Sequence, residues 1–151
     1  ITTVADIRKL SREKLIDLLG KFGGSLYEKV RGIDESPIEE REETKSIGEQ
    51  ETFFQDSLDA NFLSDNLKKI AKSVFQSFKQ SDFKTFRTIV LTVRFADFET
   101  KNRSNTLSKP ENNGKVLEFE SLKILMPFFE KKENPFHKKI RLIGLRLEKL
   151  E

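Results

Sequence analysis

The chain has 151 residues, of which 36% are hydrophobic and 35% are charged, and its net charge is +3. This length provides a core for one or two small domains and is short for a multi-domain enzyme. The sequence has no cysteine and a single histidine, His137. It therefore excludes disulfides, thiolate catalysis and Cys-based zinc sites, and leaves too few imidazoles for a histidine relay or a His-rich metal site. No apolar run approaches the roughly 20 residues of a membrane span, and the first residues lack a signal-peptide pattern, so we expect an intracellular, aqueous compartment.

The charges are unevenly distributed along the chain. Residues 1–43 carry 8 basic and 10 acidic side chains, a net charge of −2, whereas residues 44–151 carry 20 basic and 15 acidic ones, a net charge of +5. The excess of positive charge favours a polyanion as the partner of the longer segment. A solvated surface of mixed charge would show the same excess, and both interpretations stay open.

The first segment predicts short helices joined through glycines. Thr3 can cap a first turn and Ser11 a helix over 11–20, because Ser and Thr side chains accept from N–H groups of the first helical turn. Residues 20–24 (GKFGG) predict a tight connection, after which a helix restarts over 25–32. Such a helix-hairpin-helix-like segment can turn backbone N–H groups towards a DNA phosphate. An ordinary turn between two helices needs glycine for the same steric reason, so this is an alternative.

An acidic stretch separates this segment from the rest of the chain. Residues 35–44 contain Pro37 and are rich in glutamate, a composition that cannot bury enough apolar surface to fold. We therefore expect an exposed linker over 35–44, between a helical domain over 1–34 and a second domain over 45–151.

The second domain alternates between the two-residue period of strands and the 3.6-residue period of helices. In chain order the patterns predict a strand over 45–55, a helix over 59–78, strands over 86–98 and 102–108, a loop over 109–114, a helix over 115–131 and a last strand over 139–150. Pro127 lies within the second helical pattern, so it either kinks that helix or ends it early. The order β-α-β-β-α-β predicts an α+β fold, a two-layer sandwich of a four-stranded sheet with two helices on one face, preceded by the small helical segment.

The sheet face without helices is the candidate site. If odd-numbered apolar residues such as Ile47 and Leu145 pack against the helices, the residues between them face outwards. The outward set is then Ser46, Gly48, Gln50, Thr52, Thr92, Arg94, Leu142, Gly144, Arg146 and Glu148, with Lys139 and Arg141 where the last strand begins. Glycine lets a phosphate backbone approach, hydroxyls and N–H groups donate to phosphate oxygens, and arginine adds charge. The set lacks the exposed aromatics of an RNA-recognition motif, and a solvated open face is the alternative.

Four stretches resemble one protein family in the same order. TKSIGEQETF (44–53) resembles the start of the little finger domain of Y-family DNA polymerases, where a Lys-Ser-Ile/Val-Gly motif opens the first strand. LLGKFGGSLYEKVRGIDESPI (18–38) resembles the end of the thumb, particularly in the DinB-like branch of polymerases IV and kappa. FRTIVLTVRFADFETKNRSNTLS (86–108) is similar to the central hairpin of that little finger, and KIRLIGLRLEKL (139–150) to its final strand.

The resemblance implies a role in holding DNA. In the family, thumb and little finger grip primer–template DNA, and the little finger sheet contacts mainly phosphates along the major groove, which tolerates damaged templates. The DNA-binding residues implied by position, together with the outward face, are Lys45, Ser46, Ile47, Gly48, Thr52, Arg94, Arg103, Thr106, Arg141 and Arg146, with Gly20, Gly23 and Gly24 in the thumb. Leu142 stands where many relatives place an arginine, which implies a weaker grip there.

The resemblance also implies what this chain lacks. Phosphoryl transfer needs divalent metals held by carboxylates, which the family carries on a palm domain upstream of the thumb, whereas the acidic pairs Glu39–Glu40 and Glu42–Glu43 lie in the expected linker. We therefore expect no catalysis and no cofactor in this portion, with Mg²⁺ bound only by the missing palm of a lesion-bypass, DNA-directed DNA polymerase. The family's clamp-binding peptide is expected beyond Glu151.

The implied partners are double-stranded primer–template DNA and the palm and fingers domains, with no membrane. The alternative function is a protein-interaction module that binds a sliding clamp or a regulatory partner. The implied location is the cytoplasm, in association with the nucleoid, or the nucleus in a eukaryote.

Overall fold

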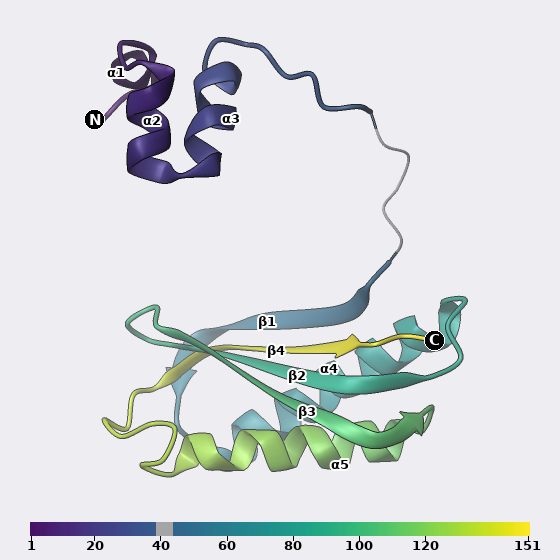
Figure 1. Ribbon diagram of the computed structural model, residues 1–151. Coiled ribbons are helices and arrows are strands. Elements are labelled where there is room, and N and C mark those ends of the chain that lie inside the picture. Colours follow the sequence, from purple (N-terminus) through teal and green to yellow (C-terminus); the bar gives the residue numbers. More distant parts are fainter. Residues whose placement is uncertain (39–43) are drawn as a thin grey trace. The chain divides into compact units, whose positions relative to one another are not determined.

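The structure is a computed structural model of the chain, and it describes residues 1–38 and 44–151. The chain separates into two compact units, Ile1–Glu42 and Glu43–Glu151 (Figure 1). The expected linker over 35–44 lies between the helical elements of the first unit and the sheet of the second, and its residues 39–43 lie outside the described part.

The first unit contains three short helices: α1 (Val4–Arg8), α2 (Arg12–Leu19) and α3 (Lys21–Lys29). The predicted caps are present, since the side chains of Thr3 and Ser11 accept from the first turns of α1 and α2. The predicted connection over 20–24 is wrong, because Gly20 alone forms the turn, with φ of 62°, and α3 begins at the next residue. Gly23 lies inside α3, where a Cβ atom would be 2.0 Å from the carbonyl oxygen of Leu15. Glycine is needed here for the close packing of two helices.

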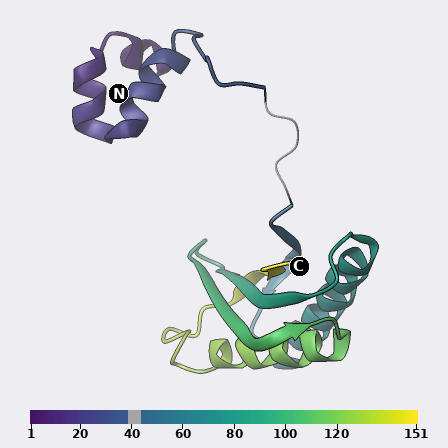
Figure 2. The ribbon, with the colours of Figure 1, turned by 45° about the vertical axis from the view of Figure 1, so that its right-hand side comes forward.

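The second unit has the predicted β-α-β-β-α-β order. Its elements are β1 (Ser46–Ser57), α4 (Ala60–Gln80), β2 (Phe86–Phe95), β3 (Thr100–Glu111), α5 (Gly114–Leu125), the 3₁₀ turn η1 (Met126–Phe129) and β4 (Ile140–Glu148). The strands form one sheet in the order β1-β4-β2-β3, and all neighbouring strands are antiparallel. Helices α4 and α5 cover the same side of this sheet (Figures 1 and 2), which confirms the α+β, two-layer prediction.

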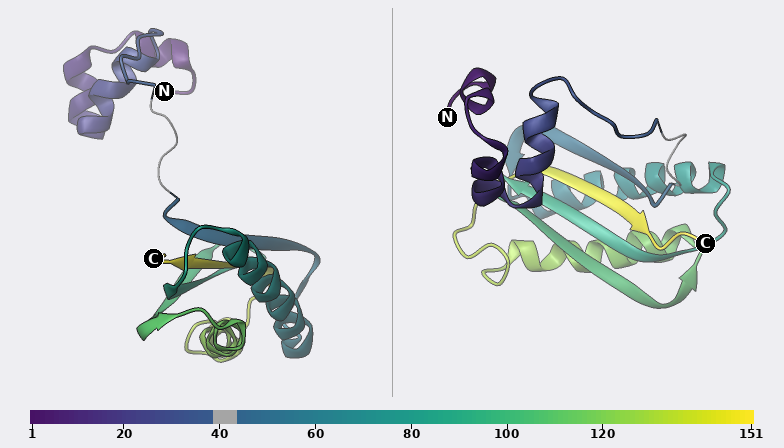
Figure 3. Two further views of the ribbon diagram at one scale, coloured as in Figure 1. Left: turned by 90° about the vertical axis from the view of Figure 1, so that its right-hand side faces the viewer. Right: turned by 45° about the horizontal axis from the view of Figure 1, so that its top comes forward.

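The core fills the space between the two helices and the sheet. Helix α4 contributes the apolar residues at its three- and four-residue spacings, of which Leu67 and Phe78 are at most 1% exposed. Ile89, Leu91 and Val93 of β2 meet them from the sheet and are fully buried. The opposite side of the sheet carries no helix of the second unit (Figure 3, left).

Two prolines mark where the element boundaries differ from the sequence patterns. Pro110 lies within β3, which extends to Glu111 instead of ending in the loop predicted over 109–114. β3 is an edge strand, and such a strand tolerates proline because one side of its backbone has no partner. Pro127 falls in η1 after α5 has ended at Leu125, so the helix is shorter than its apolar pattern and is not kinked.

Candidate nucleic-acid interface

The uncovered side of the sheet presents residues in rows that cross all four strands. Side chains directly opposite each other in paired strands share a face, and the register therefore defines the rows. In the strand order β1, β4, β2, β3 the rows are Ser46–Glu148–Thr88–Thr106, Gly48–Arg146–Val90–Ser104, Gln50–Gly144–Thr92–Asn102 and Thr52–Leu142–Arg94–Thr100. We call the residues of these four rows the open face.

The surface of the open face is recessed at its centre because two glycines, which have no side chains, lie on neighbouring strands. A Cβ atom on Gly48 would approach the carbonyl oxygen of Leu145 to 2.8 Å, and one on Gly144 would lie 3.0 Å from the Cβ of Gln50. A shallow depression forms there, and its lining includes Ser46, Gly48, Gln50, Thr92, Gly144 and Arg146. A backbone phosphate can approach the sheet more closely here than over a surface of larger side chains.

Cross-strand hydrogen bonds fix the polar side chains of β2 and β3. The hydroxyls of Thr88 and Thr106 are 3.0 Å apart, and Thr92 Oγ1 donates to Asn102 at 2.7 Å. Arg94 donates through Nε to Thr100 Oγ1 at 2.9 Å. This bond uses one of the five N–H groups of the guanidinium and leaves its two terminal nitrogens to donate to an anion.

The charge of the open face is only weakly positive. Its ionised side chains are Arg94, Arg146 and Glu148. Arg146 donates through Nε to Glu148 at 2.9 Å, and a terminal nitrogen lies 2.6 Å from the same carboxylate oxygen. One of the two arginines is therefore partly neutralised within the face. Lys45, which precedes β1 and is exposed, adds a charge at the margin.

Two predicted arginines lie outside the open face. Arg103 is opposite Leu91 in the register, which places it with the helix-covered side, and it forms an ion pair with the buried Glu133. Arg141 falls in an irregularity of the pairing between β2 and β4, where its guanidinium lies 4.7 Å from the Phe98 ring centroid and 3.7 Å from Asp56. Both side chains are engaged within the chain.

The remaining predicted residues differ in what they can offer a ligand. The side chain of Ile47 packs against the core, so only its main chain is available. Gly23 and Gly24 are buried inside α3, whereas Gly20 is exposed at the turn. Leu142 is 4% exposed, within a row between Thr52 and Arg94.

Ser104 and Asn102 were missed at the level of sequence. They belong to the open face through their register with Val90 and Thr92 on β2. The two-residue alternation of β3 would have found both residues, because it places them on one face with Thr106 and puts Arg103 on the other.

A salt-bridge cluster holds the turn between β2 and β3 against the start of β4. Lys138 Nζ lies 2.5 Å from Asp97 and 2.6 Å from Glu99. The hydrogen bond from Lys138 lowers the pKa of Asp97, and the bond to Asp97 raises the pKa of Lys138. The cluster fixes the end of the sheet at which the row Thr52–Leu142–Arg94–Thr100 lies.

The described residues offer no alternative site of metal chemistry. Across residues 1–38 and 44–151, no group of three or more His, Cys, Asp or Glu side chains is arranged to hold a metal ion. The acidic pairs Glu39–Glu40 and Glu42–Glu43 both lie outside the described residues. Within the same residues, no helix combines the length and the apolar character needed to cross a membrane.

Comparison with known proteins places this geometry in a family context. Residues 44–151 match the impB/mucB/samB family C-terminal domain. Proteins named DNA polymerase IV are similar along nearly the whole chain. The one from Leptospira interrogans serogroup Icterohaemorrhagiae serovar copenhageni is 36% identical over 149 residues, which are 97% of this chain and 41% of that protein. The one from Methanoculleus marisnigri is 30% identical over 151 residues, 100% of this chain and 40% of that protein. The chain thus spans about two fifths of the length of these relatives.

Two solved structures share the fold. A Y-family DNA polymerase chimera superposes with a TM-score of 0.69 at 16% identity, over 99% of this chain and 41% of that one. A complex of the beta-clamp processivity factor and the little finger domain of PolIV gives a TM-score of 0.57 at 15% identity, over 70% of this chain and 89% of that one. At these identities the likeness establishes the architecture.

Proposed function

The chain belongs to the impB/mucB/samB family, as a C-terminal portion of a Y-family DNA polymerase, and we propose that its open face holds the backbone of primer–template DNA during lesion bypass by the whole enzyme. The observation that carries this proposal is the set of four uncovered rows, in which hydroxyls, amides and two arginines surround two glycines. Most hydrogen bonds between proteins and DNA go to phosphate and sugar, and side chains of these types make them.

The contacts that we propose between the open face and DNA phosphates follow from the depression at Gly48 and Gly144. Over Gly48 and Gly144 a phosphate reaches the level of the sheet, where Ser46 Oγ can donate to it, whereas the single O–H of Thr92 already donates to Asn102. Arg94 approaches from the neighbouring row and can donate through both terminal nitrogens. Short side chains of this kind reach phosphates more readily than base edges, so we expect binding that does not depend on DNA sequence.

The weak charge of the open face predicts weak binding by this portion alone. A phosphate that binds Arg146 competes with Glu148, which already occupies two of its donors. The remaining basic residues at the margin, such as Lys45, then contribute through longer-range attraction. Salt largely screens such attraction at separations beyond the Debye length, which is about 10 Å at 0.1 M, so affinity should fall steeply as salt increases.

We assign no step of nucleotide transfer to this chain. That chemistry requires carboxylates which hold divalent metal ions beside the reacting phosphates, and the carboxylates of the described residues are not arranged in this way. Mg²⁺ would bind in the palm of the whole enzyme. The role that we propose for this portion is to position the duplex, and the turn at Gly20 before α3 is a second candidate phosphate contact.

A salt titration tests the proposed DNA contact. Fluorescence anisotropy of a labelled primer–template should show binding at low ionic strength, and Arg94→Ala/Arg146→Ala should weaken it. The slope of log K against log salt should fall by about 2, because each neutralised phosphate contributes about 0.9 to that slope. Lys79→Ala/Lys123→Ala is the matched control, since it removes two exposed charges from the helix-covered side. Equal slopes in the two double variants would refute the assignment.

A second candidate function is binding of a sliding clamp. The similarity to the little finger domain in a complex with the beta-clamp processivity factor favours it. Clamp binding that resists high salt, in a chain that shows no salt-sensitive binding to DNA, would support this function over the first. Both functions can coexist if they use different surfaces.

A further inference from the structure

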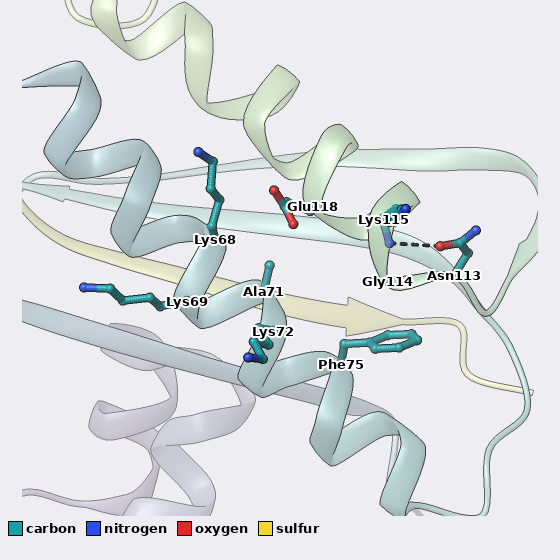
Figure 4. A pocket seen from close by; sticks show the side chains of 9 residues that line it. All are labelled: Lys68, Lys69, Ala71, Lys72, Phe75, Asn113, Gly114, Lys115 and Glu118. Carbon is teal, nitrogen blue, oxygen red and sulfur yellow. Dashed lines mark hydrogen bonds between the residues drawn. The ribbon is translucent and has the colours of Figure 1, made fainter.

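A groove with basic walls runs between α4 and the first turn of α5, on the side of the sheet opposite the open face. Its lining is Lys68, Lys69, Ala71, Lys72 and Phe75 from α4, with Asn113, Gly114, Lys115 and Glu118 from the start of α5. We call this set the lysine groove. Figure 4 shows Lys68, Ala71 and Glu118 in the space between the two helices, and Lys69 extending from α4 away from α5.

The walls of the lysine groove carry a strong excess of positive charge. Four lysines line it against one carboxylate, that of Glu118. Lys68 has an acidic neighbour, Asp65, at 3.2 Å. Among the residues that the structure describes, no carboxylate lies within ion-pair distance of Lys69, Lys72 or Lys115. The positive end of the α5 dipole adds to the field at this point.

The floor of the lysine groove is apolar. Ala71 is buried, and the half-buried Phe75 ring lies so close to α5 that a Cβ atom on Gly114 would be 2.9 Å from it. The ring lies below the first turn of α5 (Figure 4). The groove therefore offers an aromatic surface between cations, which differs from the hydroxyl and glycine surface of the open face.

We propose that the lysine groove binds an acidic peptide segment of a partner protein, with an apolar side chain against Phe75 and carboxylates on Lys69, Lys72 and Lys115. The positive charge of the groove favours a polyanion as its ligand. The apolar floor then distinguishes between a nucleic acid and an acidic peptide. A nucleic-acid backbone satisfies the lysines but leaves the apolar floor uncovered, whereas an acidic peptide with a leucine or phenylalanine covers both. Helix-lined grooves commonly bind peptides through such apolar anchors.

This proposal is independent of the proposed DNA contact. Helices α4 and α5, which line the lysine groove, cover one side of the sheet (Figure 2), and the open face is the other side, so DNA and peptide can be bound together. The groove can therefore bind a peptide whether or not the sheet holds DNA.

Anisotropy with two labelled peptides tests the inference on the 151-residue chain. The probe is Glu-Asp-Leu-Asp-Glu-Phe-Asp, and the control peptide replaces its leucine and phenylalanine with serine. We expect the probe to bind more tightly than the control peptide. Lys69→Glu/Lys72→Glu should weaken binding of the probe about tenfold. Each exposed ion pair that is lost should lower the affinity about two- to fivefold, and the double variant removes two of them. Lys79→Glu/Lys123→Glu, the matched charge reversal outside the groove, should leave affinity within about twofold. Circular dichroism and thermal unfolding verify that both variants fold.

Several outcomes would overturn the inference. Failure of the probe to bind at low ionic strength would do so, as would equal affinity of the two peptides or of the two double variants. Displacement of the probe by duplex DNA, together with loss of DNA affinity in Lys69→Glu/Lys72→Glu, would show that the groove is a nucleic-acid surface. Retention of the probe in the presence of excess duplex would support two separate surfaces.

Discussion

Glu148→Gln should strengthen DNA binding, although it removes an ion pair from the folded protein. In the free chain Glu148 holds Arg146 through two contacts of 2.9 and 2.6 Å. A phosphate on Arg146 would have to displace this carboxylate and then remain near it. At a separation of about 6 Å in water the repulsion between carboxylate and phosphate is about 0.7 kcal/mol, and the variant also removes the competition for Arg146.

Together these two effects should amount to about 1 kcal/mol, or about fivefold in affinity, at low salt. The folded state should lose at most about 1 kcal/mol, since both side chains are partly exposed and surface ion pairs contribute little. Anisotropy titrations with a primer–template at several salt concentrations measure the effect, which should shrink as salt screens the charges. Glu118→Gln on α5 changes net charge equally and controls for a general electrostatic gain. If Glu148→Gln binds no more tightly than Glu118→Gln, the phosphate does not lie at Arg146.

Three further predictions concern the supporting structure. Gly23→Ala should destabilise the packing of α2 and α3 by about 1–3 kcal/mol, because its Cβ would overlap the Leu15 carbonyl; native-state hydrogen exchange of the first unit measures the loss. Phe78→Ala should cost about 3–5 kcal/mol of unfolding free energy, since Phe78 is 1% exposed and packs edge-on to another phenylalanine; urea unfolding of the second unit reports it, and an unchanged midpoint contradicts the core assignment. The pKa of Asp97 is lowered by Lys138, so the stabilisation from this pair is present above the usual aspartate pKa and disappears as pH falls through the lowered value. Asp97→Asn should therefore remove a small part of the pH dependence of the unfolding free energy at acidic pH. NMR titration of the Asp97 carboxyl in the unsubstituted chain should show the lowered pKa directly.

Alternation in the central strands made the open face predictable. β2 and β4 follow a two-residue period over most of their length, so the sequence placed Arg94, Gly144 and Arg146 together, and the register confirms that they share one face. Alternation is informative here because one side of each strand meets a continuous apolar core, and a slip by one residue would expose that core.

The parts that sequence patterns did not predict depend on partners distant in the chain. The irregular pairing at Arg141 depends on how β4 meets the end of β2, and no local pattern encodes it. Alternation in β3 places Arg103 on the helix-covered side, but its buried charge partner Glu133 lies 30 residues later, and no local pattern identifies that ion pair. Gly23 follows the pattern of a turn residue, yet it is needed for the contact between α2 and α3, which only the packed structure reveals.

The pairing of β1 with β4 has a mechanical consequence. Ser46 at the start of β1 is opposite Glu148 at the end of β4, so the chain enters and leaves the second unit at the same end of two neighbouring strands. A force that pulls these two points apart loads the inter-strand hydrogen bonds one pair after another, because antiparallel strands pulled from one end separate like a zipper. The sheet should therefore yield at low force when it is pulled through its own ends. It should resist more strongly when it is pulled between Ser46 and a residue at the far end of β4, where many bonds bear the load together. Single-molecule pulling from the two pairs of attachment points would measure this difference.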